Sequence, residues 1–221
     1  MRYLSLIFTL IFWGITAMAI EKPEYHVLET HENFELRKYD SYIVAETEIT
    51  GNFDDVGNKA FRILFNYISG ANQTNQKIKM TAPVEQSAKK NGGEKIKMTA
   101  PVIQESAGDQ SDRYVIGFVM PSKYTMETIP EPTDSSITLR KTQEKLVAAH
   151  KYSGTWSEKR YRKHEAILLD SLKNTGFQII GNPIYARYNP PFMPWFLRRN
   201  EVLIEVERPA STPQYTNQTN N

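Results

Sequence analysis

The sequence predicts an α+β fold in which duplicated β-α-β-β units form a distorted antiparallel β-barrel flanked by two helices. The main observation is a distant internal repeat. Shifting the chain by 103 positions brings six identical residues into register within a window of some twenty, where about one would be expected by chance. Both windows predict strand, strand and helix in the same order, and further strands follow each. The two halves span about 33–121 and 136–207, and a cleft between them would suit a ligand.

A second observation is the phrase KIKMTAPV, which occurs at 77–84 and again 18 positions later at 95–102. Apolar and polar residues alternate in each copy, which predicts two antiparallel strands joined by an exposed loop at 85–94. The proline of each copy cannot donate to a ladder and would end the pairing. Alternation favours a core role over a sulfur site for the two methionines. The positions predicted to face the core include Ile78, Met80, Ala82, Val84, Ile96 and Met98.

The remaining elements follow from apolar periodicity. One helix is predicted from Phe53 to about Ser69, with Asn52 or Asp54 as its N-cap, and a second runs from about Ser157 to Asn174. Strands are predicted at 34–39, 42–50, 113–120, 137–141, 146–152, 177–188 and 201–207.

The N-terminus has the pattern of a secretory signal peptide over residues 1–19. Arg2 precedes an apolar stretch at 4–15, and Ala17-Met18-Ala19 matches a small-x-small cleavage site. We expect a mature chain that begins near Ile20, crosses the inner membrane and resides in the periplasm of a Gram-negative source. The alternative is an uncleaved anchor. The rest of the chain would form one domain over 20–208 and a disordered polar tail over 209–221.

Composition excludes several classes of protein. The net charge of +2 is near neutral and the basic residues are dispersed, so no nucleic-acid partner is expected. The absence of cysteine excludes disulfides, thiolate metal sites and a cysteine nucleophile. Four histidines without HExxH-like spacing do not predict a zinc site. We expect a monomer with no membrane span after cleavage.

Three stretches resemble the SOUL haem-binding family. They are the repeated MTAPV phrase, the segment Phe118-Val119-Met120-Pro121, and the string YNPPFMPWFLRRNEV over 188–202. The resemblance covers about 30–208. It implies a distorted barrel of two related halves and non-catalytic, reversible binding of haem or related porphyrins, without an established catalytic residue.

The resemblance places the porphyrin in a surface groove between the first helix and the Pro-Pro loop. Aromatic residues would form the walls, and Arg198 and Arg199 would pair with the propionates; alternatively, the two arginines pair with structural carboxylates. Met193 stands where some relatives carry a lysine. An axial ligand is not predicted, because His150 and His164 have the surroundings of hydrogen-bonded core residues. The implied binding residues are Asn58, Phe61, Arg62, Phe65, Tyr188, Met193, Trp195, Phe196, Arg198 and Arg199.

The leading hypothesis is therefore a haem or tetrapyrrole carrier or buffer. The alternative is an effector-binding module for another hydrophobic small molecule, which would require an acidic residue in the cleft; the sequence does not place one there. No paired carboxylates, nucleophile elbow or metal cluster supports an enzyme.

Overall fold

The computed structural model describes residues 21–88, 113–189 and 192–208. They form a ten-stranded sheet and two α-helices, with one short 3-10 helix, η1. In chain order the elements are β1 (Tyr25–Thr30), β2 (Glu35–Tyr39), β3 (Ile43–Thr50), α1 (Phe53–Ile68), β4 (Val84–Ala88), β5 (Arg113–Val119), β6 (Ile137–Lys141), β7 (Lys145–Tyr152), α2 (Glu158–Leu172), β8 (Gln178–Ile179), β9 (Ile184–Arg187), η1 (Trp195–Leu197) and β10 (Asn200–Glu207).

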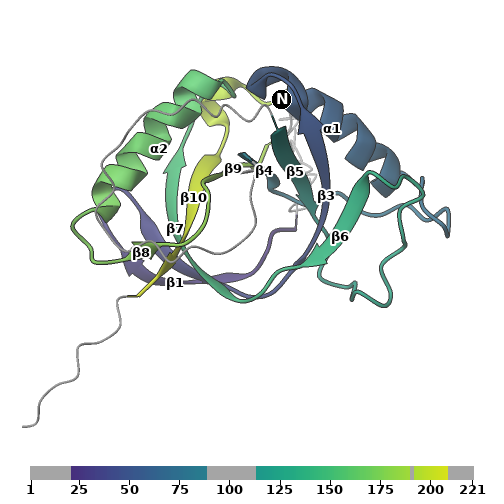
Figure 1. The fold of residues 1–221 in the computed structure, drawn as a ribbon, viewed down its shortest axis with the longest axis horizontal. Helices are drawn as coiled ribbons and strands as arrows, with labels where there is room; N and C mark the ends of the chain where they lie inside the picture. The colour runs from purple at the N-terminus through teal and green to yellow at the C-terminus, as the bar shows by residue number, and fades with distance from the viewer. Residues whose placement is uncertain (1–20, 89–112, 190–191, 209–221) are drawn as a thin grey trace, which may run out of the picture.

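The strands form one curled antiparallel sheet in the order β1-β2-β7-β10-β9-β4-β5-β3-β6, with β8 pairing on β10 (Figure 1). β1 and β8 have no counterpart in the other half. For the other eight strands, exchanging β2, β7, β10 and β9 with β6, β3, β5 and β4 gives the same order read from the opposite edge. The pairing register follows the same exchange, because Ala45 lies opposite Leu139 and Ala148 lies opposite Leu36. Both pairs are related by the shift of 103 positions. The predicted α+β fold, a distorted antiparallel barrel with two helices, is confirmed.

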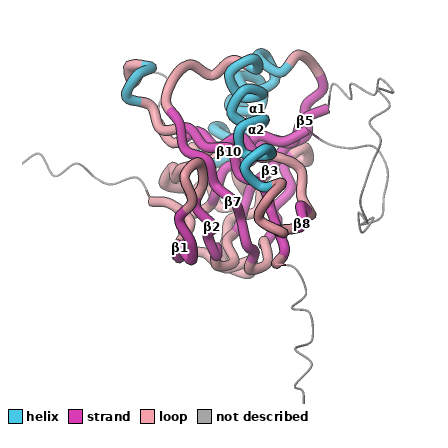
Figure 2. The backbone as a smooth tube through the Cα atoms, turned by 90° about the vertical axis from the view of Figure 1, so that its left-hand side faces the viewer, coloured by secondary structure: helices cyan, strands magenta, loops and turns pink. Residues whose placement is uncertain are grey.

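Both helices lie on the same face of the sheet (Figures 1 and 2). The main core fills the space between them and the strands, because each helix places one apolar stripe against the sheet. The stripe of α1 is narrower than the sequence predicts, since Phe65 is 44 % exposed. No helix within the described ranges is long and apolar enough to cross a membrane. The helix residues buried in this core include Phe53, Val56, Ala60, Leu64, Tyr161 and Leu168.

The prediction for the first KIKMTAPV copy is wrong. Residues 77–83 form no strand. The strand β4 starts only at Val84, the last residue of the predicted strand, and runs into the predicted loop. Ile78 and Ala82 are buried as expected, but Met80 is 36 % exposed. The backbone of this segment bonds to scattered partners, since Ile78 N donates to Ile68 O and Ala82 N donates to Glu21 O. The second copy, with Ile96 and Met98, lies outside the described residues.

Two further differences concern strands. No strand is predicted where the structure has β1, which pairs with β2. The strand predicted over 177–188 is divided into β8 and β9 around Gly181-Asn182-Pro183. A proline lacks the amide proton that a central strand requires, and a Cβ at Gly181 would lie only 2.9 Å from Glu205 Cβ. Asn52 and Ser157 occupy the N-cap positions, although neither side chain makes a capping hydrogen bond.

Candidate functional site

The outer face of α1 carries two stacked aromatic side chains. The rings of Phe61 and Phe65 are 5.7 Å apart between centroids and nearly parallel. Phe61 also packs edge-on against Phe118 of β5, which fixes the pair to the sheet. Asn58 and Arg62 are exposed beside these rings, and Arg62 Nε donates to the Asn58 carbonyl at 3.5 Å. The two rings form an aromatic ledge, an apolar surface on α1 with the positively charged Arg62 at its edge.

Arg187, the last residue of β9, lies between α1 and α2. Its Nε donates to the Tyr161 hydroxyl at 2.8 Å, and Nη2 donates to Gln86 Oε1 at 2.6 Å. A Cβ at Gly57 would lie 3.0 Å from Arg187 Nη1, so glycine allows α1 to approach the guanidinium closely. The guanidinium also lies 5.4 Å from the ring centroid of Trp156. None of the described carboxylates forms an ion pair with Arg187, and its two acceptors given above, Tyr161 and Gln86, are neutral.

The base of the loop between β9 and β10 is held by a buried ionic network around Glu201. The carboxylate accepts from Tyr188 Oη at 2.7 Å, from Arg199 Nη2 at 2.7 Å, and from both terminal nitrogens of Arg37. Burial by itself would raise the pKa of Glu201, but the hydrogen bonds and charges of the two arginines lower it below its ordinary value. Arg199 also lies 4.2 Å from the Tyr188 ring centroid. These side chains therefore fasten the loop to the sheet.

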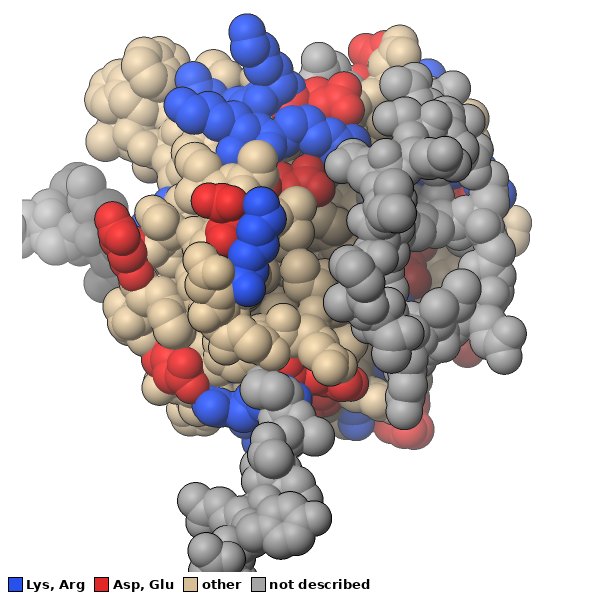
Figure 3. Space-filling model, turned by 60° about the vertical axis from the view of Figure 1, so that its left-hand side comes forward, with Lys and Arg blue, Asp and Glu red and all other residues tan. Residues whose placement is uncertain are grey.

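The tip of the same loop is apolar and exposed. Arg198 Nε donates to the Met193 carbonyl at 2.7 Å, and the Arg198 guanidinium stacks 4.3 Å from the ring centroid of Trp156. Figure 3 shows Lys and Arg side chains gathered at the upper edge of the face that carries α2. The exposed fractions of the tip side chains are 84 % for Phe192, 56 % for Trp195, 58 % for Phe196 and 62 % for Leu197.

Comparisons with known proteins decide the family. The sequence model of the SOUL heme-binding protein family matches residues 20–92 and 86–205. The chain belongs to the SOUL family. A relative, "Heme-binding protein 1" of Xenopus tropicalis, is 27 % identical over 170 residues, which cover 76 % of this chain and 81 % of the relative.

Solved structures share the SOUL-like fold at low identity. The C-terminal domain of EcmrR superposes with a TM-score of 0.58 at 10 % identity, covering 84 % of this chain and 99 % of that one. A hydrolase from Listeria innocua has a TM-score of 0.51 at 10 % identity, covering 81 % of this chain and 94 % of its own. At these identities the likeness concerns the fold alone.

The residues that the SOUL resemblance implied fall into two environments. On α1, Asn58, Arg62 and Phe65 are exposed and Phe61 is half-buried. In the loop, the tip residues Trp195 and Phe196 are exposed, and Met193 and Arg198 are half-buried. Tyr188 is only 6 % exposed, and Arg199 is engaged by Glu201. Both residues contact the buried carboxylate of Glu201. For Arg199 this is the alternative stated above, in which the arginine pairs with a structural carboxylate.

Sequence reasoning did not single out Arg187 and Trp156, which the structure places beside the predicted residues. A signal for Arg187 was present: it lies two positions after Tyr185 in an extended segment, so both side chains emerge on the face that carries the helices. Trp156 is joined to the loop through its Nε1, which donates to Asn200 Oδ1 at 2.9 Å. The two residues are 44 positions apart, so no local sequence pattern predicts this contact.

His150 and His164 of this SOUL protein hydrogen-bond to each other. His150 is buried and bonds through Nδ1 to the Asn33 carbonyl; because a carbonyl only accepts, Nδ1 carries the proton. His150 Nε2 therefore accepts from His164 Nδ1 at 2.9 Å. Burial lowers the pKa of His164 to about 4. Within the described ranges, no three His, Asp or Glu side chains are placed to hold a metal ion.

Proposed function

We propose that this protein binds haem or a related tetrapyrrole without transforming it, on the surface between the outer face of α1 and the loop that joins β9 to β10. Its role would be that of a carrier or buffer. Haem is a flat apolar disc with two carboxylates at one edge, so a site needs aromatic walls and nearby cations.

The observation that carries the proposal is the position of Arg187. It lies at the junction of α1, α2 and the loop, and none of the described carboxylates neutralises it. A propionate could accept from the guanidinium in the bidentate manner that arginine favours. The aromatic ledge of Phe61 and Phe65 and the aromatic tip of the loop would contact the ring. These residues fit a porphyrin in kind, and neither α1 nor the loop contains a histidine to ligate its iron.

A paired titration tests the proposal. Haemin added to the protein should produce a saturable Soret shift, and iron-free protoporphyrin should also bind, because walls and cations recognise the ring and its carboxylates. Arg187→Gln should weaken haemin binding at least about tenfold, which is 1.4 kcal/mol, and should affect a porphyrin with esterified propionates less. Arg140→Gln, at a surface ion pair with Glu46, is the matched control. Absence of binding by both haemin and protoporphyrin would refute the function.

We further propose that residues 1–19 are cleaved as a signal peptide, that the mature protein is a periplasmic monomer, and that its two halves arose by duplication. The duplication is supported by the pairing register, because β2 pairs with β7 in the same register, shifted by 103 positions, as β6 pairs with β3. Intact mass of the protein recovered from the periplasmic fraction tests the first: a chain that retains Met1 would contradict it.

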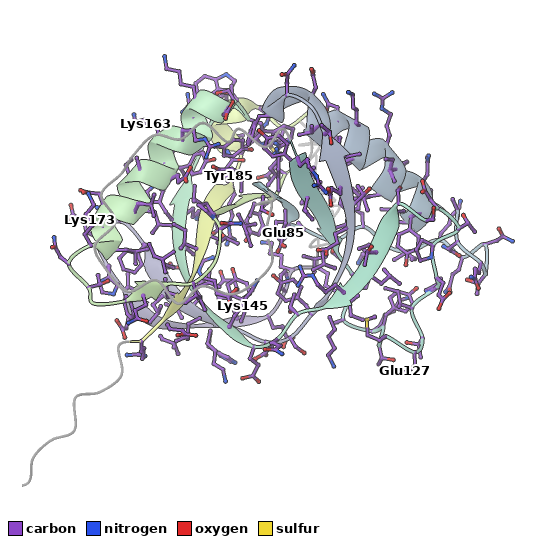
Figure 4. All side chains as sticks on the ribbon, viewed as in Figure 1. Glu85, Glu127, Lys145, Lys163, Lys173 and Tyr185 are labelled. Carbon is purple, nitrogen blue, oxygen red and sulfur yellow. The ribbon has the colours of Figure 1, made fainter. Side chains whose placement is uncertain are left out.

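A second candidate function is binding of an apolar cation on the face of the sheet opposite the helices. Glu85 of β4 is buried there and accepts from the Tyr42 hydroxyl at 3.0 Å. Burial raises the pKa of Glu85, although Lys145 opposes the shift; Figure 4 shows Glu85 near the middle of the sheet. Tyr42 also lines a cavity of about 420 Å³ between residues 21–24, the start of β3 and the segment after β5. Retention of a lipophilic cationic dye, but not of haemin, would favour this function.

A further inference from the structure

The loop between β9 and β10 ends in an apolar tip, defined as Phe192, Trp195, Phe196 and Leu197. Between 56 % and 84 % of each of these side chains is exposed. The other large apolar side chains that the structure exposes reach at most 48 %. Single exposed apolar residues are ordinary, whereas four within six positions are typical of a contact surface.

The tip is held in an outward-facing conformation. Trp195–Leu197 form the 3-10 helix η1, and Leu197 N donates to the Pro194 carbonyl at 2.9 Å. The rings of Trp195 and Phe196 pack edge to face, 5.5 Å apart. Arg198 ties the turn back to Met193 and stacks on Trp156, next to the start of α2. Because the turn is already ordered, little conformational freedom is lost when the tip binds.

Basic side chains flank the tip. Lys159 and Lys163 lie one turn apart on the exposed side of α2, and Figure 4 places Lys163 toward the upper end of that helix and Lys173 at the lower end. Neither Lys159 nor Lys163 forms an ion pair with a described carboxylate. Arg162 between them is neutralised by Glu158 and Glu165. The surface beside the tip therefore carries unbalanced positive charge, which complements an anionic partner.

We propose that the apolar tip docks to the surface of an anionic phospholipid bilayer, with its aromatic side chains at the headgroup boundary and Lys159 and Lys163 near the phosphates. The side chain of Phe192, 84 % exposed, projects into solvent, a shape that suits insertion into lipid better than a groove-bound peptide. Tryptophan and phenylalanine beside lysine are the residues that interfacial membrane segments use. This inference goes beyond haem binding and does not depend on it, although Trp195 and Phe196 also belong to the proposed haem surface.

The test uses haem-free protein of residues 20–221, which contains every described element and lacks the apolar leader. It is mixed with vesicles of phosphatidylcholine alone or with one quarter phosphatidylglycerol, and sedimented. We expect at least about tenfold more binding to the anionic vesicles, weakened by salt. Emission from Trp195 should shift to the blue and be quenched by brominated lipid; Trp195→Phe should remove that quenching.

Two sets of variants separate the contributions. Replacing Phe192 and Phe196 together by serine should reduce binding to anionic vesicles at least about tenfold. Lys159→Gln with Lys163→Gln should reduce binding to anionic vesicles while leaving the weak binding to neutral vesicles unchanged. Lys173→Gln, at the lower end of α2 and paired with Asp170, is the control and should behave like the parent. Thermal unfolding confirms that each variant is folded.

Several outcomes would overturn the proposal. Equal sedimentation with neutral and anionic vesicles would show that the basic side chains do not select an anionic surface. Binding of the serine variant at the level of the parent would show that the apolar tip is not the docking surface. A dimer that dissociates in the serine variant, without vesicle binding, would assign the tip to a second copy of the chain. Haemin titration of the same variants reports separately on the haem proposal, so one can fail without the other.

Discussion

Arg199 and Arg187 are both cations of the candidate surface. We expect them to have different roles, because Arg199 is paired with Glu201 whereas no described carboxylate pairs with Arg187. Replacing Arg199 by alanine removes its hydrogen bonds of 3.0 Å and 2.7 Å to Glu201 Oε1. The side chain of Glu201 is fully buried. Arg37 remains bound to the same carboxylate. We therefore expect the free energy of unfolding to fall by about 1–3 kcal/mol, the usual cost of an unsatisfied buried polar group. Complete loss of the partners of a buried ion would cost more, about 3–5 kcal/mol.

The assay combines thermal unfolding with haemin titration. For a domain of this size, each kcal/mol lowers the unfolding midpoint by about 2–4 °C, so Arg199→Ala should lower it by about 2–12 °C. The protein that remains folded should bind haemin as the parent does. Arg187→Gln should show the reverse: haemin affinity falls at least about tenfold, while the midpoint changes less than in Arg199→Ala.

The reasoning would be refuted by the exchanged result. If Arg199→Ala weakens haemin binding tenfold at an unchanged midpoint, the Glu201 network does not determine the role of Arg199. If Arg187→Gln binds haemin normally, the unneutralised guanidinium is not a propionate partner, and the proposed surface loses its main support.

Three further predictions concern pH and packing. Because the pKa of Glu85 is raised on folding, this group favours the folded state below its unfolded pKa near 4.5 and loses that contribution as pH rises; Glu85→Gln should therefore raise the unfolding midpoint at pH 7 more than at pH 4. The pKa of His164 is lowered from 6.5 to about 4, so its contribution is present above pH 6.5 and lost as pH falls toward 4; midpoints of His164→Gln measured across that range should decline less than those of the parent. Ile78→Ala should cost about 2–4 kcal/mol in chemical denaturation, and Met80→Ala less than about 1 kcal/mol; equal costs would restore the predicted strand.

The sequence by itself determined both helices and most of the strands. Apolar residues at helical spacing located α1 and α2, and alternation located β3, β5, β6, β7 and β10 to within two residues. These patterns are reliable because each records which face of one local element meets the core. The shift of 103 positions is likewise a property of the chain alone, and the register of Ala45 and Ala148 agrees with it.

Tertiary structure decided the partners. Alternation predicted a strand over 77–84, but a strand also needs a neighbour with free backbone groups, and this segment bonds to Ile68 and Glu21 instead. The resemblance of residues 188–202 to the SOUL family predicted that Tyr188 and Arg199 lie at a binding surface. In the structure both contact Glu201, which is buried beneath the loop. Arg187 meets Gly57 and Tyr161 only because β9 ends between the two helices. Long-range contacts of this kind depend on how the sheet curls, which no local periodicity records.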